Sequence, residues 1–217
     1  KSILYNYTMS NNHNQILHVY KSRKNILTIL SSQGYEVEDY QSFSFNEIDA
    51  MFSNNQLDML IDNPITKQKA YIKYYPSKQI RPNNLDEVIE DLYFIENVLE
   101  KKDNLIIITE DEPNDSILSK VKYLYDHDGI FVIIHNIKRL QYNMLEHSLV
   151  PKCDVLTNQE KADFMNEYNV NNPVLQLPEI SRFDPQALVM CIRPGEIAKF
   201  TRESITSLEA DYYRICI

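Results

Sequence analysis

Four polar side chains between residues 58 and 73 come closest, in type and spacing, to a hydrolytic centre. Asp58 and Asp62 precede Tyr71 and Lys73. A nuclease of the PD-(D/E)xK type requires an acid, and then a second acid two residues before a lysine. The two carboxylates hold a divalent metal, and the ammonium stabilises the attacking water or the developing charge. Tyr71 occupies the position of the second acid, and a phenol cannot replace a hard anionic ligand of Mg²⁺. The spacing therefore favours architecture over chemistry, and a metal-dependent nuclease is kept as the alternative function.

The remaining candidates for catalysis or metal binding lack the required spacing. The chain has 5 histidines and 3 cysteines, and Cys153, Cys191 and Cys216 form no C-x-x-C pair. It has 3 glycines, too few for a glycine-rich phosphate loop, and no G-x-S-x-G motif. We therefore predict no catalytic residue, no metal ion, no cofactor and no disulfide, with reduced thiols in the cytosol or nucleus.

The basic residues between positions 67 and 81 are the candidate contacts to nucleic acid. Lysine and arginine bind phosphates without reading sequence. The alternative interpretation is an ordinary solvated edge, since lysines also protect the edges of sheets. The net charge of −9 and a sequence pI near 5.1 predict that any DNA contact is local and weak, or is supplied mainly by partners, because an autonomous DNA binder concentrates positive charge. No apolar run is long enough to span a membrane. The candidate DNA contacts are Lys67, Lys69, Lys73, Lys78 and Arg81.

Hydrophobic periodicity divides the chain into two domains. In residues 1–142, strands alternate with helices, which predicts an α/β layered fold whose central strands pair in parallel. Two short apolar runs in this domain are typical of strands buried on both faces. Asn84 and Glu87 predict a capping box at the start of the second long helix. The predicted elements are helix 13–33, strands 57–62 and 69–75 forming a hairpin, helix 85–101, strand 105–109, helix 116–126, strand 130–134 and a short helix 137–142.

Residues 143–217 predict a small α+β domain. Thr157 and Glu160 form a T-x-x-E capping box, which begins a helix that ends near Tyr168. Asp184 and Pro185 supply an N-cap and a proline at the first helical position. Extended structure is expected at 177–180, and strands are expected at 196–202 and 211–217, joined by a turn that contains serine and threonine.

Two stretches of this second domain, residues 146–157 and 177–185, resemble the assembly domain of the fifth subunit of eukaryotic nuclear RNA polymerases and its smaller archaeal counterpart. The resemblance departs at three positions. Cys153 stands where the family usually has histidine, Glu203 where proline is common, and Leu208 where glycine is common. Leucine tolerates positive φ poorly, which puts the turn geometry around residues 203–210 in question. The closing matches are Gly195, Lys199, Arg202, Ser204, Thr206, Tyr213 and Arg214.

Residues 1–142 resemble, more loosely, the N-terminal jaw domain of the eukaryotic protein, a domain that the archaeal counterpart lacks. The shared features are a first helix that ends at Gly34, a hairpin that ends in Tyr74, Tyr75 and Pro76, and the strand at 105–109. The family's jaw domain is similar to the layered nuclease fold but is inactive. Two domains imply a eukaryotic lineage or a large DNA virus that carries its own polymerase. The implied location is the nucleus for a cellular protein, or the virion and the cytoplasmic viral factory for a viral one.

The resemblance implies a non-catalytic subunit of a multisubunit DNA-dependent RNA polymerase. The assembly domain would dock on the largest subunit, near the sixth subunit, and the jaw domain would flank downstream double-stranded DNA. Nucleotidyl transfer would belong to the two largest subunits. A transcription adaptor that uses the assembly fold away from the polymerase is a further alternative, and Arg214 could equally be an internal strut paired with an acid. The implied docking residues are Pro151, Pro178, Asp184, Pro185, Arg202, Tyr213 and Arg214.

Overall fold

The computed structural model describes residues 2–75 and 80–217, with side chains from Asn14 onward. The chain divides into two compact units, the first ending at Asn143 and the second spanning Met144–Ile217. Of the residues singled out above, Pro76 and Lys78 lie outside the described residues. No helix within the described residues is both long enough and apolar enough to cross a lipid bilayer.

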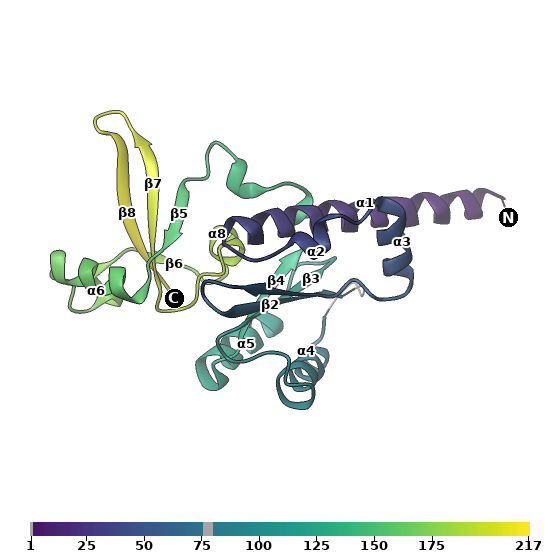
Figure 1. Cartoon of the computed structure of the whole chain (residues 1–217), viewed down its shortest axis with the longest axis horizontal. Helices are drawn as coiled ribbons and strands as arrows, with labels where there is room; N and C mark the ends of the chain where they lie inside the picture. Colours follow the sequence, from purple (N-terminus) through teal and green to yellow (C-terminus); the bar gives the residue numbers. More distant parts are fainter. Residues whose placement is uncertain (1, 76–79) are drawn as a thin grey trace. The chain divides into compact units, whose positions relative to one another are not determined.

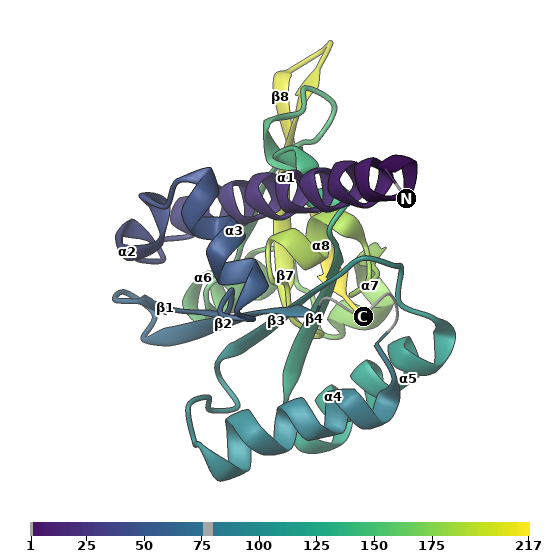
Figure 2. The same ribbon diagram turned by 90° about the vertical axis from the view of Figure 1, so that its right-hand side faces the viewer.

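The first unit has three layers, with a four-stranded sheet between two layers of helices (Figure 2). α1 (Ser2–Ser32), α2 (Glu38–Gln41) and α3 (Phe45–Ser53) lie on one side of the sheet, and α4 (Pro82–Ile89) and α5 (Asp115–Tyr123) lie on the other. β1 and β2 form an antiparallel hairpin, whereas β2, β3 and β4 run parallel, as predicted. The strands, in their order across the sheet, are β1 (Met59–Asn63), β2 (Gln68–Tyr75), β3 (Asn104–Thr109) and β4 (Phe131–Asn136).

Helices cover both faces of the central parallel strands β3 and β4 (Figure 2). Every residue of β3 and β4 is buried, which confirms that the two continuous apolar runs are strands buried on both sides. The apolar stripe predicted for the second long helix also faces the core, since Leu85, Val88, Ile89 and Leu92 are buried. A 3₁₀ turn (Arg139–Gln141) lies within the short helix predicted at 137–142.

The second long helix differs from its predicted bounds at both ends. It begins at Pro82, directly after Arg81, and no side chain caps it. The predicted capping box is therefore wrong, because Asn84 already lies inside the helix. α4 continues as a π-helix, η1 (Glu90–Ile95), and the chain leaves the helix at Asn97, whose φ is 51°. Asparagine adopts this left-handed conformation at low cost, so it ends the helix before the predicted residue 101.

The helices α2 and α3 were not predicted. Ser44 begins α3 with a capping box, since its hydroxyl accepts from the Glu47 amide and the Glu47 carboxylate accepts from the Ser44 amide at 2.7 Å. The S-x-x-E spacing of these two residues was the sequence signal for this helix. α1 also begins earlier than the predicted residue 13.

A second four-stranded sheet organises the second unit, in the order β5-β7-β8-β6. The β7–β8 hairpin extends beyond its short pairings with β5 and β6 (Figure 1). Both predicted helix caps are confirmed: Thr157 and Glu160 form a capping box, and the Asp184 carboxylate accepts from the Gln186 amide at 2.9 Å. The elements are β5 (Lys152–Val155), α6 (Asn158–Glu167), α7 (Pro173–Gln176), β6 (Glu179–Ile180), α8 (Pro185–Val189), β7 (Ile197–Ser204) and β8 (Leu208–Cys216).

The three positions that depart from the family pattern have different environments. Cys153 lies in the core beside Phe200, where burial raises the pKa of its thiol to about 12 and keeps it neutral. Glu203 pairs directly across the hairpin with Glu209, an arrangement that like charges destabilise. Leu208 has a φ of 64°, so a leucine holds the left-handed backbone that glycine adopts freely.

Replacing Leu208 by glycine is expected to stabilise the second unit by about 0.5 kcal/mol. The left-handed conformation costs a leucine about 1 kcal/mol, and the greater freedom of glycine in the unfolded chain offsets part of that gain. Little apolar burial is lost, because Leu208 is 85% exposed. Urea unfolding would measure the change, with Leu208→Ala as the matched control, since alanine keeps the Cβ. An equal stability of the two variants would contradict the assignment of strain to this position.

Candidate functional site

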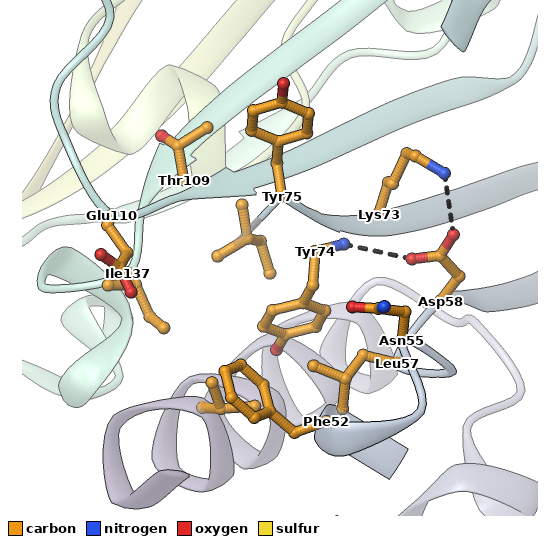
Figure 3. A pocket seen from close by; sticks show the side chains of 12 residues that line it. Phe52, Asn55, Leu57, Asp58, Lys73, Tyr74, Tyr75, Thr109, Glu110 and Ile137 are labelled. Atoms are coloured by element: carbon orange, nitrogen blue, oxygen red, sulfur yellow. Dashed lines mark hydrogen bonds and ion pairs between the residues drawn. The ribbon is translucent and has the colours of Figure 1, made fainter. Parts of the chain in front are cut away.

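The Asp58 carboxylate lies at the end of the β1–β2 hairpin and accepts three hydrogen bonds. Lys73 Nζ donates to it at 3.0 Å, the Tyr71 hydroxyl at 3.1 Å and the Tyr74 backbone amide at 3.3 Å. Figure 3 shows Lys73 and the Tyr74 amide converging on Asp58. The lysine that the nuclease pattern would use is therefore held in an ion pair with the first acid.

Tyr71 remains a neutral donor in this cluster. Burial, followed by the nearby carboxylate of Asp58, raises the pKa of the Tyr71 phenol well above its ordinary value. The other nearby acid, Asp62, is exposed on β1 and pairs in register with Lys69. Within the described residues, no three His, Cys, Asp or Glu side chains are grouped closely enough to hold a metal ion. The cluster around Asp58 thus closes the end of the hairpin by hydrogen bonds.

Replacing Asp58 by asparagine is expected to lower the free energy of unfolding by about 1–2 kcal/mol. The amide keeps the shape but removes the charge that accepts from Lys73, and hydrogen bonds to a charged group are worth more than neutral ones. The Asp58 side chain is 29% exposed, so solvent screens only part of this interaction. Urea unfolding of Asp58→Asn beside the exposed control Asp62→Asn would test it. Equal losses in the two variants would contradict a structural role for Asp58.

A pocket of about 260 Å³ adjoins this cluster on the side of the sheet that faces α1. Figure 3 shows Tyr74 and Phe52 at its apolar side, with Thr109 at the end of β3 and Glu110 directly after it. Arg23 is buried next to it and donates to the Leu57 carbonyl oxygen at 2.9 Å. Its burial lowers the pKa of the guanidinium. The pocket was not predicted, because its lining comes from five separate segments.

The predicted DNA contacts that the structure describes lie on different elements of the first unit. Lys67 lies in the hairpin turn with a φ of 56°, and Arg81 precedes α4; both are exposed. The Lys69 amide donates to the buried Asp103 carboxylate at 2.8 Å, which fixes the backbone while the side chain is half-buried. Lys73 is engaged by Asp58. Of the described candidates, Lys67 and Lys69 therefore lie near the start of β2, Lys73 lies toward its end, and Arg81 lies outside it.

Three of the predicted docking residues of the second unit contact α8 or β8. Asp184 caps α8, and the Gln186 side chain donates to the Pro151 carbonyl oxygen at 2.8 Å. The Pro178 carbonyl oxygen accepts from the Ile215 amide at 2.9 Å. These contacts give Pro151, Asp184 and Pro178 roles inside the unit, in addition to any role at its surface.

The aromatic and basic candidates divide between the two faces of the hairpin. Arg202 and Arg214 both lie over the ring of Tyr212, with guanidinium-to-centroid distances of 5.1 and 5.7 Å. Tyr213 points to the opposite face, where its ring packs 4.2 Å from that of Phe164. Strand alternation separates Tyr213 from the two arginines. Tyr212 was not predicted from the sequence, although the same period of two would have placed it on the same face as Arg202 and Arg214.

Arg214 has a backbone partner in this arrangement. Its Nη1 donates to the Glu179 carbonyl oxygen at 3.2 Å. Among the residues that the structure describes, neither Arg202 nor Arg214 makes an ion pair with a carboxylate. The strut that was considered for Arg214 thus involves a carbonyl oxygen rather than an acid.

The second unit is similar in sequence to known proteins. The family model described as "RNA polymerase Rpb5, C-terminal domain" matches residues 142–216. The chain is 33% identical over 78 residues to the DNA-directed RNA polymerase subunit Rpo5 of Archaeoglobus fulgidus, a match that covers 36% of this chain and 100% of that relative.

Two relatives from Arabidopsis thaliana extend the similarity to the first unit. DNA-directed RNA polymerase V subunit 5A is 23% identical over 186 residues, which cover 83% of this chain and 79% of the relative. DNA-directed RNA polymerase subunit 5-like protein 1 is 24% identical over 224 residues, covering 96% of this chain and all of the relative. The match to the archaeal protein covers its whole length at 33% identity, and the family model matches residues 142–216. The chain therefore belongs to the Rpb5/Rpo5 family of DNA-directed RNA polymerase subunits.

Proposed function

We propose that this chain is a non-catalytic subunit whose second unit docks on the largest polymerase subunit, beside the sixth, while its first unit acts as a jaw that flanks downstream DNA. The observation that carries the docking role is the coverage of the archaeal relative. That protein has about the length of the second unit, and all of it is matched. The part that every family member needs for assembly is therefore expected to be the second unit. The two largest subunits would supply nucleotidyl transfer.

The geometry around Asp58 favours this function over the nuclease alternative. Asp58 is saturated by Lys73, Tyr71 and the Tyr74 amide, and Tyr71 cannot supply a second anionic metal ligand. A hydrolytic site would need the lysine and the first acid to face a substrate phosphate instead of each other. The first unit is therefore proposed to act as a rigid jaw without hydrolytic activity. The protein is expected wherever the polymerase works, which is the nucleus for a cellular enzyme, or the viral factory and virion for a viral one.

The docking role predicts recovery of the polymerase with the chain. A tagged full-length chain, expressed in its native cell or viral infection, is expected to co-purify with the two largest subunits at equal stoichiometry. Quantitative mass spectrometry of the purified complex would measure this ratio. Recovery of the chain with transcription factors in the absence of the two largest subunits would instead support the adaptor alternative.

Weak DNA contact is expected from the start of β2 because phosphate-binding lysines add affinity without sequence choice. In the assembled polymerase, Lys67→Gln/Lys69→Gln is expected to lower the affinity for a downstream duplex a few-fold, with a salt dependence reduced by about one or two ions. Lys122→Gln, at an exposed position of α5, is the matched control. Equal affinities in the double variant and the control would assign these lysines to an ordinary solvated edge.

A further inference from the structure

Charge is segregated between the two faces of the β7–β8 hairpin. Residues paired in register share a face, and successive residues alternate. One face, which we call the arginine face, carries two arginines and no carboxylate; its residues outside the core are Arg202, Ser204, Leu208, Ala210, Tyr212 and Arg214. The opposite face carries three acids and one lysine; its residues outside the core are Lys199, Thr201, Glu203, Glu209, Asp211 and Tyr213. In a chain of net charge −9, the arginine face is a local positive surface.

The lysine of the opposite face is already neutralised. Lys199 Nζ lies 2.8 Å from Asp211, which also accepts from the Thr201 hydroxyl at 2.7 Å. The short strands do not supply an acid to the arginine face either, since the register places Asp154 of β5 and Glu179 of β6 on the opposite face, beside Lys199 and Ile215. The two guanidiniums thus have no carboxylate from the strands of their own sheet.

Tyr212 holds the two guanidiniums in place. Its ring stacks on buried Phe200, with a centroid distance of 5.2 Å and an interplanar angle of 19°, so the ring is anchored to the core. Arg202 and Arg214 lie over that ring, and Arg214 is further fixed by the Glu179 carbonyl oxygen. An aromatic ring attracts a guanidinium over its face without using its N–H donors. Donors therefore remain for an external anion, in the planar fork that suits a carboxylate.

From this arrangement we infer that Arg202, Tyr212 and Arg214 form a receiving site for the carboxylate of an aspartate or glutamate on another polymerase subunit. The inference rests on the proposed docking of the second unit and names the chemistry of its contact. Nucleic acid is the less suitable anion, because its row of phosphates brings many negative charges near a hairpin that also carries Glu203, Glu209 and Asp211, whereas a single carboxylate needs only the two guanidiniums. The exposed Leu208 on the same face would contact apolar groups beside that acid.

Charge reversal separates this site from docking in general. In the complex purified through the tagged chain, Arg202→Glu/Arg214→Glu is expected to reduce retention on the polymerase at least tenfold in salt washes, because it opposes a carboxylate with like charge. Glu203→Arg/Glu209→Arg is the matched control, since it changes the same amount of charge on the opposite face of the same hairpin. Thermal unfolding of each free chain would confirm that both variants remain folded.

A zero-length cross-link would identify the acid. In the assembled complex, Arg214→Lys keeps the positive charge and introduces an amine, which a carbodiimide joins to a carboxylate in direct contact. The expected product is an amide between position 214 and an aspartate or glutamate of another subunit, located by mass spectrometry. Cross-links confined to this chain, with retention unchanged in the charge-reversed variant, would overturn the carboxylate site but leave docking intact. Unchanged retention with weakened binding of a DNA duplex would also overturn it and would assign the anion as phosphate. Failure of the wild-type chain to co-purify would overturn docking as well.

Discussion

Lowering the pH from 7 to 4.5 is expected to destabilise the first unit by about 2–3 kcal/mol through His135 alone. His135 lies on β4 and is 3% exposed, and its Nε2 has no hydrogen-bond partner among the described residues. Burial, and to a smaller extent the positive charge of Arg139, lowers the pKa of its imidazole to about 4. An unfolded histidine has a pKa of about 6.5, so the unfolded chain takes up a proton first as the pH falls. The stabilisation is complete above pH 6.5, decreases below it, and levels off under about pH 4.

A variant that lacks only His135 isolates this effect from the titration of carboxylates. Urea unfolding at pH 7 and at pH 4.5 gives the stability that each protein loses on acidification. The loss is expected to be about 2–3 kcal/mol larger for the wild type than for His135→Leu. His18→Leu, which removes an exposed histidine of α1, is the matched control and is expected to behave like the wild type. Parallel losses in the wild type and His135→Leu would show that the folded protein admits the protonated imidazole.

The elements that the sequence predicted best are those whose pattern has a single physical solution. A run such as residues 105–109 has no polar face, so a strand covered on both sides satisfies it, and the alternation with helices makes its neighbours parallel. The cap at Asp184 was equally predictable, because a short acidic side chain followed by proline fits the start of a helix and little else. In these places the local preference and the tertiary structure agree.

The missed elements depend on partners that are distant in sequence. β5 has four residues and reads as a loop by itself; it becomes a strand because β7 offers an edge from Ala198 to Thr201. The end of the second long helix was misplaced because Leu99 continues the apolar stripe, although its amide bonds to the Leu92 carbonyl oxygen outside helical geometry. Periodicity indicates which residues face the core, but it does not show that the helix has already ended.

For the candidate sites, the sequence likewise identified some of the residues but not the contacts between them. Spacing identified Asp58 and Lys73 as a pair of interest, but their mutual ion pair and the Tyr71 contact follow from the hairpin register that the structure supplies. Arg202 and Arg214 came from resemblance alone, which cannot separate a docking residue from an internal one. Their common ring at Tyr212 gives both a physical reason for their orientation.

Replacing Phe200 by alanine is expected to cost about 3–5 kcal/mol, the largest single loss in the second unit. Phe200 is 2% exposed and lies in one core with Cys153, Ala187 and Ile192. Its removal leaves a cavity among these core residues, and it also removes the ring on which Tyr212 stacks. A unit of this size has a total stability of the same order, so much of it should be unfolded at 37 °C.

Hydrogen exchange resolves which unit is affected by Phe200→Ala. Protection is expected to fall in β7 and β8 while it remains in β3 and β4 of the first unit, because the two units have separate cores. The exposed Ile205→Ala serves as the control and should leave both patterns unchanged. If docking belongs to the second unit, Phe200→Ala must also release the chain from the polymerase even though its first unit is still folded. A variant that keeps its place in the complex despite unprotected β7 and β8 would transfer the docking role to the first unit.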